Sequence, residues 1–165
     1  MVLMLLACIA KHGPERAAEP TPIDVVPVLS SVADSKVTGA TDPLSKALGD
    51  VLAARNLQPT MMSTDSYLAA FAGTRDTRRR IELLHVSRPM LLVETETAFY
   101  SELSGRYRWI VKATVSLEPA GLTESFEVPV FLQFQHEREP EAVSAAAPVI
   151  ARRAGELVDG WLAAP

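Results

Sequence analysis

Residues 90–99 read MLLVETETAF, and they begin the part of the chain that decides the fold. The segment is rich in residues that favour strands, and from Val93 onward polar and apolar positions alternate. Alternation with a period of two is typical of a strand that buries one face and exposes the other. The segment therefore predicts a strand at one layer of a two-layer domain.

Two more segments of the same kind follow. Residues 104–105 (SG) predict a tight turn, in which Gly105 takes the positive φ that hairpin turns need. Apolar and polar residues alternate along 107–117, with Ile110 as the exception, and the sequence EPAG at 118–121 predicts a second turn. A third alternating strand is expected to line one face with Phe126, Val128, Val130, Leu132 and Phe134. These patterns predict three antiparallel strands whose apolar face needs a cover on one side.

Helical patterns supply that cover. Leu44, Ala47, Leu48, Val51 and Leu52 recur at spacings of three and four, which predicts a helix with one buried face, capped by Asp42 and with Pro43 in its first turn. A similar pattern between Val143 and Trp161 predicts a second helix, in which Pro148 is expected to cause a kink or a restart. Short helices are expected over 63–71 and from Thr74 or Asp76 to about Val86.

Two shorter strand patterns complete the domain. Residues 23–29 (IDVVPVL) predict a strand, which Pro27 places at an edge or near its end, and residues 57–62 predict a weaker one. The order of elements predicts an α+β fold, with an antiparallel or mixed sheet of four to five strands and helices packed mainly on one face.

The beginning of the chain carries a different signal. Residues 1–8 (MVLMLLAC) place an apolar run before Cys8, the only cysteine, and LLAC resembles a bacterial lipobox. Acylation of Cys8 would anchor the protein to a membrane, since each buried methylene contributes about 0.8 kcal/mol. No Lys or Arg precedes Cys8, so either the natural start lies upstream of Met1 or the resemblance is accidental and residues 1–10 form an apolar strand with a buried cysteine.

The chain divides into three parts on this reading. Residues 1–8 are expected to be a truncated, signal-like segment, residues 9–22 a tether, and residues 23–165 a single α+β domain. The tether contains Gly13, Pro14, Pro20 and Pro22 and almost no large apolar residue, which is the composition of an extended linker.

Composition narrows the classes of function. The chain is 48% hydrophobic and 22% charged, with a formal net charge of −4, which is typical of a globular domain and argues against nucleic acid as a partner. It has no run of the roughly 20 apolar residues that span a bilayer. Because Cys8 is the only cysteine, disulfides and thiolate metal sites are excluded.

Catalytic patterns are not found. His12, His85 and His136 are the only histidines, and no pair has the spacing of a helical metal site. We therefore expect no catalytic residues, no metal, no cofactor and no enzymatic activity. Glu94 and Glu96 share one strand face, where we expect a solvated surface rather than a catalytic carboxylate pair.

Four arginines lie close together in one predicted helical segment: Arg75, Arg78, Arg79 and Arg80. They are compatible with a solvated helix face paired with Asp76 and Glu82. They are also compatible with a contact to an acidic partner, a phospholipid headgroup or an anionic polymer of the cell wall. The polar face of the sheet, with Arg108, Lys112, Glu94 and Glu96, is also compatible with a partner contact, although exposed faces of this kind are common.

A family resemblance rests on three segments. Residues 23–29, residues 44–57 and the sequence GRYRWIVKATV at 105–115 are similar to the opening strand, first helix and Gly-x-Tyr hairpin of the domain shared by the TolB amino-terminal domain, CsgG and LpoB. The resemblance covers roughly residues 23 to 163 and lies in pattern more than in motif. It implies a role in assembly or activation, such as stimulating an envelope enzyme or joining a secretion or polysaccharide-export apparatus.

These observations predict a bacterial envelope lipoprotein, anchored by Cys8, whose periplasmic domain binds another envelope protein. The residue that follows Cys8 is Ile9 rather than Asp, which favours the outer membrane. Three alternatives stay open: a soluble ligand-binding or regulatory module with Cys8 unmodified, an enzyme built from scattered carboxylates, and a lipopolysaccharide-assembly lipoprotein that needs a transporter barrel.

Overall fold

A computed structural model describes residues 19–31, 37–103, 106–133 and 139–164. The predicted acylation site Cys8, most of the tether, the turn at 104–105, Phe134, and the histidines His12 and His136 lie outside these residues. The elements are, in chain order, β1 (Thr21–Ser31), β2 (Val37–Gly39), α1 (Asp42–Ala53), β3 (Leu57–Met61), the 3₁₀ helix η1 (Thr64–Ser66), α2 (Leu68–Phe71), α3 (Thr77–Leu83), β4 (Met90–Leu103), β5 (Arg106–Glu118), β6 (Leu122–Leu132) and α4 (Glu139–Leu162).

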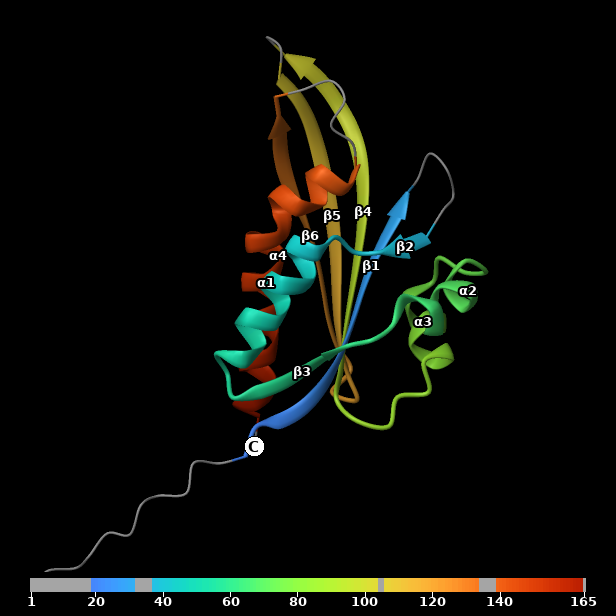
Figure 1. The fold of residues 1–165 in the computed structure, drawn as a ribbon, viewed down its shortest axis with the longest axis vertical. Helices are drawn as coiled ribbons and strands as arrows, with labels where there is room; N and C mark the ends of the chain where they lie inside the picture. The colour runs from blue at the N-terminus through green and yellow to red at the C-terminus, as the bar shows by residue number, and fades with distance from the viewer. Residues whose placement is uncertain (1–18, 32–36, 104–105, 134–138, 165) are drawn as a thin grey trace, which may run out of the picture.

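One mixed sheet of six strands forms the centre of the fold: five follow the order β2-β1-β4-β5-β6, and β3 pairs with β1 off this path (Figure 1). Strands β4, β5 and β6 are antiparallel neighbours, with Val93 opposite Val115 and Val111 opposite Val128. This confirms the three alternating strands predicted from the sequence. Strand β1 runs parallel to β4 on one side, and on its other side it pairs first with β3 and then with β2.

The two long helices, α1 and α4, lie side by side over one face of the sheet (Figure 1). Leu44, Leu48 and Leu52 of α1 and Ile150 of α4 are fully buried there. They pack against the apolar face of the strands, which is the face that the alternation predicted. The main hydrophobic core therefore lies between these helices and the sheet.

A smaller core lies on the opposite face. Val26, Val28 and Leu92 of the sheet pack there against Tyr67 and Phe71, which come from the segment of short helices between β3 and β4. The Tyr67 hydroxyl donates a hydrogen bond to the Pro27 carbonyl at 2.8 Å, and burial raises the pKa of Tyr67 to about 12. On this face the short helices thus cover β1 and the first part of β4, and they do not cover β5 or β6.

The structure confirms the α+β class with a mixed sheet, and adds a sixth strand to the four or five expected. The additional strand, β2, lies in a stretch that reads as a polar connection in the sequence. Pro27 lies inside β1, between Val25, the last residue of β1 that pairs with β3, and Val28, the first that pairs with β2. The missing N–H of Pro27 therefore removes no ladder hydrogen bond, because the strand has no β3 or β2 partner at that position.

Two helix details differ from the sequence prediction. Helix α1 begins at Asp42, and its N-cap position is Thr41, which makes no side-chain capping bond, so Asp42 is a first-turn residue rather than the cap. Helix α4 continues through the exposed Pro148 without a restart. Of the helices among the described residues, none has both the length and the apolar character needed to cross a membrane.

Candidate functional site

Strands β5 and β6 present one face that the described helices leave uncovered. On this face of β6, every side chain is exposed: Thr123, Ser125, Glu127, Pro129 and Phe131. Their neighbours on β5 carry the hydroxyl, charged and apolar side chains that the sequence placed opposite the core. We call this surface the open face. It is three strands wide, because β4 borders it as well; α3 covers Glu94 at its near end, and β4 is uncovered beyond that residue.

The strand register arranges the open face in rows. From one end of the strands to the other, the rows are Glu94–Thr114–Ser125, Glu96–Lys112–Glu127, Ala98–Ile110–Pro129, and Arg108–Phe131. Directly opposite residues on neighbouring strands have Cβ atoms about 5 Å apart, so the members of a row are in reach of one another. The open face therefore changes from hydroxyl-bearing to charged and then to apolar along the strands.

An exposed apolar patch occupies the last two rows. A bulge between Phe99 and Ser101 adds Tyr100 to the edge of the row formed by Arg108 and Phe131. Tyr100 is 66% exposed and Phe131 is 56% exposed. With Ala98, Ile110 and Pro129 they form what we call the apolar patch. Such patches, rimmed by polar residues, mark interaction sites on soluble domains.

Arg108 is held within this patch. Its guanidinium carbon lies 4.6 Å from the centre of the Tyr100 ring, a cation–π contact. Its Nε atom is buried and has no hydrogen-bond partner among the described residues. On the opposite side of the same strands, Phe99 packs edge-on against Trp109, with ring centres 5.6 Å apart. The aromatic side chains therefore stiffen this end of the sheet from both sides.

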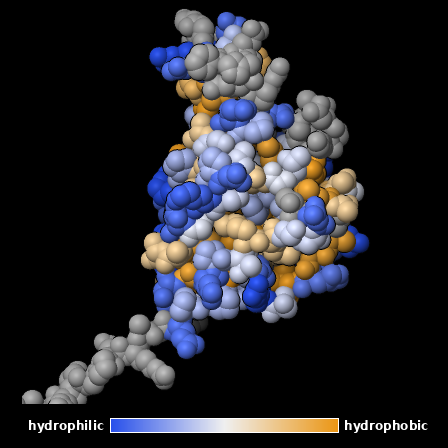
Figure 2. All heavy atoms as spheres, in the orientation of Figure 1, coloured by the Kyte–Doolittle hydropathy of each residue, from blue (hydrophilic) through white to orange (hydrophobic). Residues whose placement is uncertain are grey.

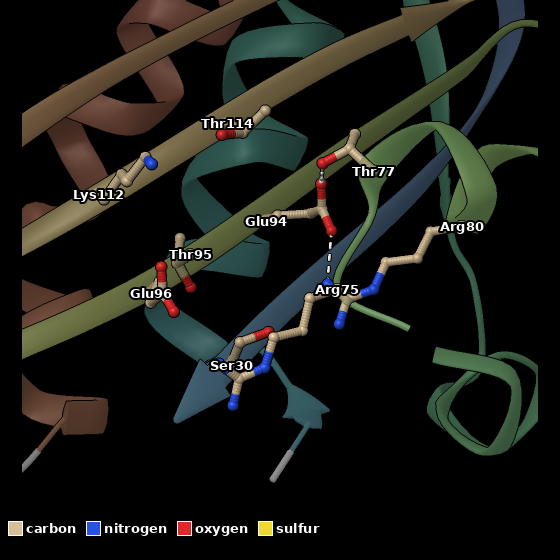
Figure 3. A pocket seen from close by; sticks show the side chains of 9 residues that line it. All are labelled: Ser30, Arg75, Thr77, Arg80, Glu94, Thr95, Glu96, Lys112 and Thr114. Atoms are coloured by element: carbon tan, nitrogen blue, oxygen red, sulfur yellow. Dashed lines mark hydrogen bonds and ion pairs between the residues drawn. The ribbon is translucent and has the colours of Figure 1, made fainter. Parts of the chain in front are cut away.

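A polar hollow of about 210 Å³ lies at the other end of the open face, between α3 and the strands (Figure 3). We call it the charged hollow. Its lining comes from β1, from α3 and the residues before it, and from β4 and β5: Ser30, Arg75, Thr77, Arg80, Glu94, Thr95, Glu96, Lys112 and Thr114.

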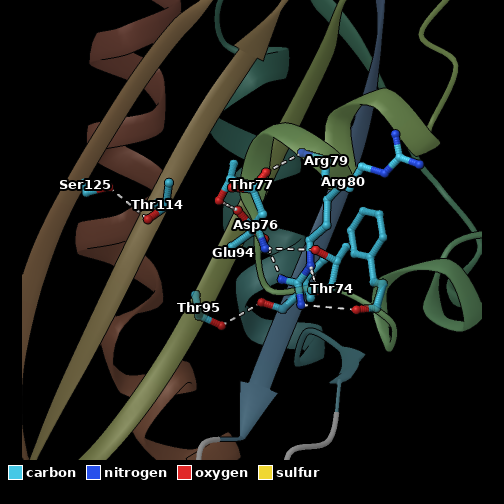
Figure 4. Close-up of polar contacts among 11 residues, drawn as sticks. Thr74, Asp76, Thr77, Arg79, Arg80, Glu94, Thr95, Thr114 and Ser125 are labelled. Carbon is cyan, nitrogen blue, oxygen red and sulfur yellow. Dashed lines mark hydrogen bonds and ion pairs between the residues drawn. The ribbon is translucent and has the colours of Figure 1, made fainter.

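A buried ion pair forms one wall of the charged hollow. Arg80 Nη1 lies 2.6 Å from Glu94 Oε1, and the two residues are only 3% and 8% exposed (Figure 4). The hydroxyl of Thr77 donates to the other oxygen of Glu94, and Arg80 Nε donates to the carbonyl of Thr74 at 2.8 Å. Every charged atom of the pair thus has protein hydrogen bonds in place of water.

The expectation of a solvated glutamate face was therefore wrong for Glu94. Helix α3 packs over that part of β4 and places Arg80 on its inward side, where the guanidinium also lies 5.1 Å from the centre of the Phe71 ring. Glu96, two residues further along the strand, is only partly buried and lines the hollow. Glu94 and Glu96 have equivalent positions in the alternating pattern, so the sequence alone predicts the same exposure for both. The packing of α3 buries Glu94 and leaves Glu96 partly exposed.

The structure separates the four predicted arginines. Arg80 is buried, and Arg75 is exposed at the charged hollow. Arg78 and Arg79 are exposed and both pair with Glu82, at 3.9 and 2.9 Å, as a solvated helix face would. Asp76 accepts a hydrogen bond from the backbone N–H of Arg79 at 2.7 Å and caps α3. The cluster is thus divided between a surface helix face and the hollow.

Two polar groups of the hollow, one exposed and one buried, have no ion-pair or hydrogen-bond partner in the described part of the chain. Lys112 lies opposite Glu96 on one side and Glu127 on the other, yet no ion pair within 4.0 Å joins it to any described carboxylate. The hydroxyl oxygen of Ser30 is buried and has no hydrogen-bond partner there either. Sequence reasoning missed Ser30 and Thr77, because only the folded chain brings them beside β4.

Within residues 19–31, 37–103, 106–133 and 139–164, no three His, Cys, Asp or Glu side chains converge. His85 follows α3 and has a φ of 48°, the left-handed conformation common after a helix end.

On the face that Figure 2 presents, hydrophobic and charged side chains are interspersed over the body of the domain. This view does not single out the apolar patch, which is defined by the exposed fractions of its residues and by the strand register.

Comparison with known proteins finds similar solved structures only. No family model and no curated protein matches the sequence. The chain is similar to a minor lipoprotein from Acinetobacter baumannii, with 12% identity, a TM-score of 0.40, and coverage of 87% of this chain and 95% of that one. It is similar to lipoprotein GNA1162 from Neisseria meningitidis, with 11% identity, a TM-score of 0.39, and coverage of 88% and 100%.

A third similar structure is the PelC dodecamer from Paraburkholderia phytofirmans, with 11% identity, a TM-score of 0.39, and coverage of 88% of this chain and 92% of that chain. Likeness at this level assigns no family. The resemblance to the TolB amino-terminal domain, CsgG and LpoB stays a prediction from the sequence.

Proposed function

We propose that the chain is a lipid-anchored protein of the bacterial envelope whose domain binds another envelope protein and catalyses no reaction of its own. The observation that carries this proposal is the apolar patch on the open face. Tyr100 and Phe131 are large and exposed, and they flank Arg108 on a surface that no described element covers.

The composition of the patch suits a protein partner. Tyrosine and arginine are enriched among the residues that dominate the free energy of protein–protein binding. The patch also has a polar rim, since the row Glu96–Lys112–Glu127 lies next to it. An apolar centre with charged residues at its border is the usual anatomy of such an interface.

The strands make the patch rigid. Its residues come from three neighbouring antiparallel strands, and the cation–π contact fixes Arg108 against Tyr100. A partner that docks here pays little to order the surface, because the backbone positions are set by the sheet.

The proposed anchor is Cys8, the predicted site of acylation, which would hold the protein in the membrane through buried methylene groups. Residues 9–20, fully extended, would reach about 40 Å at most, at roughly 3.3–3.6 Å per residue. A domain on such a tether would meet partners near the membrane surface. We place it at the outer membrane, because Ile9 rather than Asp follows Cys8.

A second candidate function is an unanchored module that binds a small ligand, with Cys8 unmodified. The charged hollow favours it, because it combines a built, partly buried wall with polar groups that lack partners in the described chain.

Two measurements on the same cells test the proposal. The gene is expressed with its native upstream DNA, cells are fed labelled palmitate, and wild type is compared with Cys8→Ala after membrane fractionation. We expect label and membrane attachment in the wild type only. A wild type that stays unlabelled and soluble would exclude the anchor and favour the unanchored module.

The partner is sought by photo-crosslinking in the same cells. A photoreactive amino acid replaces Tyr100 or Phe131 in turn, and Val149, which is exposed on α4, is the matched control position. We expect one discrete protein adduct from positions 100 and 131 and none from position 149. Equal adducts from all three positions would contradict the assignment of the open face.

A further inference from the structure

The charged hollow is separate from the apolar patch, and its chemistry differs. We propose that it binds a small zwitterion, a molecule of about the size of one amino acid that carries one ammonium and one carboxylate. This inference rests on the second candidate function, ligand binding at the hollow, and names its ligand class; it needs neither an anchor nor a protein partner.

The lining of the hollow presents both signs of charge to a ligand. Arg80 and Glu94 neutralise each other within the wall at 2.6 Å. The remaining charged side chains of the lining are Arg75, Lys112 and Glu96. A ligand that fills this space therefore meets both signs of charge.

Lys112 provides the contact for a ligand carboxylate. Its ammonium is exposed at the hollow and makes no ion pair of 4.0 Å or less with a described carboxylate. It has three N–H donors, and hydrogen bonds between a cation and a carboxylate are about twice as strong as neutral ones.

Glu96 and Ser30 provide the contacts for a ligand ammonium. Glu96 lines the hollow and makes no ion pair with a described cation, although it lies directly opposite Lys112 on the neighbouring strand. The Ser30 hydroxyl oxygen is buried without a hydrogen-bond partner in the described residues. A buried polar atom of this kind costs free energy until a partner satisfies it.

The geometry favours a zwitterion over a simple ion. An anion alone would place negative charge near Glu96, and a cation alone would lie near Lys112. A zwitterion places its carboxylate near Lys112 and its ammonium near Glu96. The volume of about 210 Å³ is smaller than the roughly 300–1,000 Å³ of pockets that hold drug-sized molecules, so the ligand is small.

The test uses the full chain and measures backbone amide shifts by NMR during titration. The probes are three zwitterions of increasing length, namely glycine, 4-aminobutanoate and 6-aminohexanoate. Butanoate and butylammonium, which carry one charge each, are the matched controls. We expect at least one zwitterion to shift the signals of the residues that line the hollow, and to bind at least tenfold more tightly than either control.

Two variants and a matched control place the site. Lys112→Met and Glu96→Gln should each weaken binding of the zwitterion at least tenfold. Glu127→Gln should change it less than twofold, because Glu127 is the other carboxylate opposite Lys112 but lies outside the hollow.

Three results would overturn the inference. The first is that none of the zwitterions shifts these signals in the wild type. The second is that butanoate or butylammonium binds as tightly as the best zwitterion, which would make the hollow a site for simple ions. The third is that Glu127→Gln weakens binding as much as Glu96→Gln, since the effect would then come from the general field of the strand row. All three leave the crosslinking test of the apolar patch unaffected.

Discussion

Arg80 Nη1 lies 2.6 Å from Glu94 Oε1, and this contact fastens α3 to β4 where both side chains are almost completely excluded from water. The removal of two charges from water is costly, and the mutual attraction offsets that cost only when the geometry is good and further hydrogen bonds are present. Here Thr77 and the Thr74 carbonyl supply them. The pair therefore fixes the helix that borders the open face.

Arg80→Met should lower the free energy of unfolding by about 3–5 kcal/mol, because it leaves the Glu94 carboxylate buried without its cation. Chemical denaturation measures the change. The double variant Arg80→Met with Glu94→Leu should recover most of the loss. Arg79→Met is the matched control, since Arg79 forms an exposed pair with Glu82 and such pairs contribute at most about 1 kcal/mol. Equal losses in the two single variants would contradict a structural role for the buried pair.

Tyr100→Ala and Phe131→Ala should each weaken partner binding at least tenfold and change the free energy of unfolding by only about 0.5 kcal/mol, as exposed residues do. Phe71→Ala provides the contrast, because Phe71 is fully buried and its truncation should cost about 3–5 kcal/mol. Adduct yield in the crosslinking assay and thermal unfolding are measured on the same proteins. Loss of stability at positions 100 and 131 would mean that these side chains serve the fold.

Gly155→Ala should destabilise the protein by about 1–3 kcal/mol, because α1 and α4 are in close contact there. A Cβ at position 155 would lie 2.7 Å from both Val51 Cγ1 and the guanidinium carbon of Arg55. Gly160→Ala in the same helix is the control. A Cβ there meets nothing within 4 Å, so its helix propensity should stabilise the protein by up to about 1 kcal/mol. Two variants with the same sign of effect would show that the helix contact is not limiting.

Asp159→Asn should destabilise the protein at neutral pH and have a smaller effect in acid. Arg55 donates two hydrogen bonds of 2.7 Å to the Asp159 carboxylate and lowers its pKa in the folded state. A lowered pKa contributes stability that is complete above the unfolded-state value, about 3.9, and is lost as the pH falls through the folded-state value. Denaturation of wild type and variant at neutral pH and below pH 4 measures the difference. In an Arg55→Met background, the effect of Asp159→Asn on the free energy of unfolding should no longer depend on pH. If it still does, the pH dependence comes from another group.

The sequence predicts the parts of the fold that have regular periods. The strands from Met90 to Leu132 were predicted because one face is buried and the other is polar, so the alternation carries the information. Helices α1 and α4 were predicted for the same reason at a period of three to four residues. Strand β2 was missed, because three partly buried residues beside a longer strand leave no periodic signal.

The candidate site was predicted only in part. The sequence identified a basic cluster, but it did not separate Arg80, which is buried, from Arg78 and Arg79, which are solvated. That distinction depends on the side of α3 that faces β4. The charged hollow combines residues from position 30 to position 114, so no local pattern reveals it. The apolar patch likewise depends on register, since Arg108 and Phe131 meet across two strands.

The position of β1 has a mechanical consequence. The segment predicted to be a tether precedes this strand, whose parallel ladder with β4 runs from Asp24–Met90 to Ser31–Thr97. If the membrane pulls on the tether while a partner holds the far strands, the force acts along β1, and the ladder is loaded in shear rather than peeled apart one bond at a time. Force spectroscopy between the tether and β6 should therefore find a high rupture force. A domain attached in this way would carry tension between a membrane and its partner through a strand that is paired with three others.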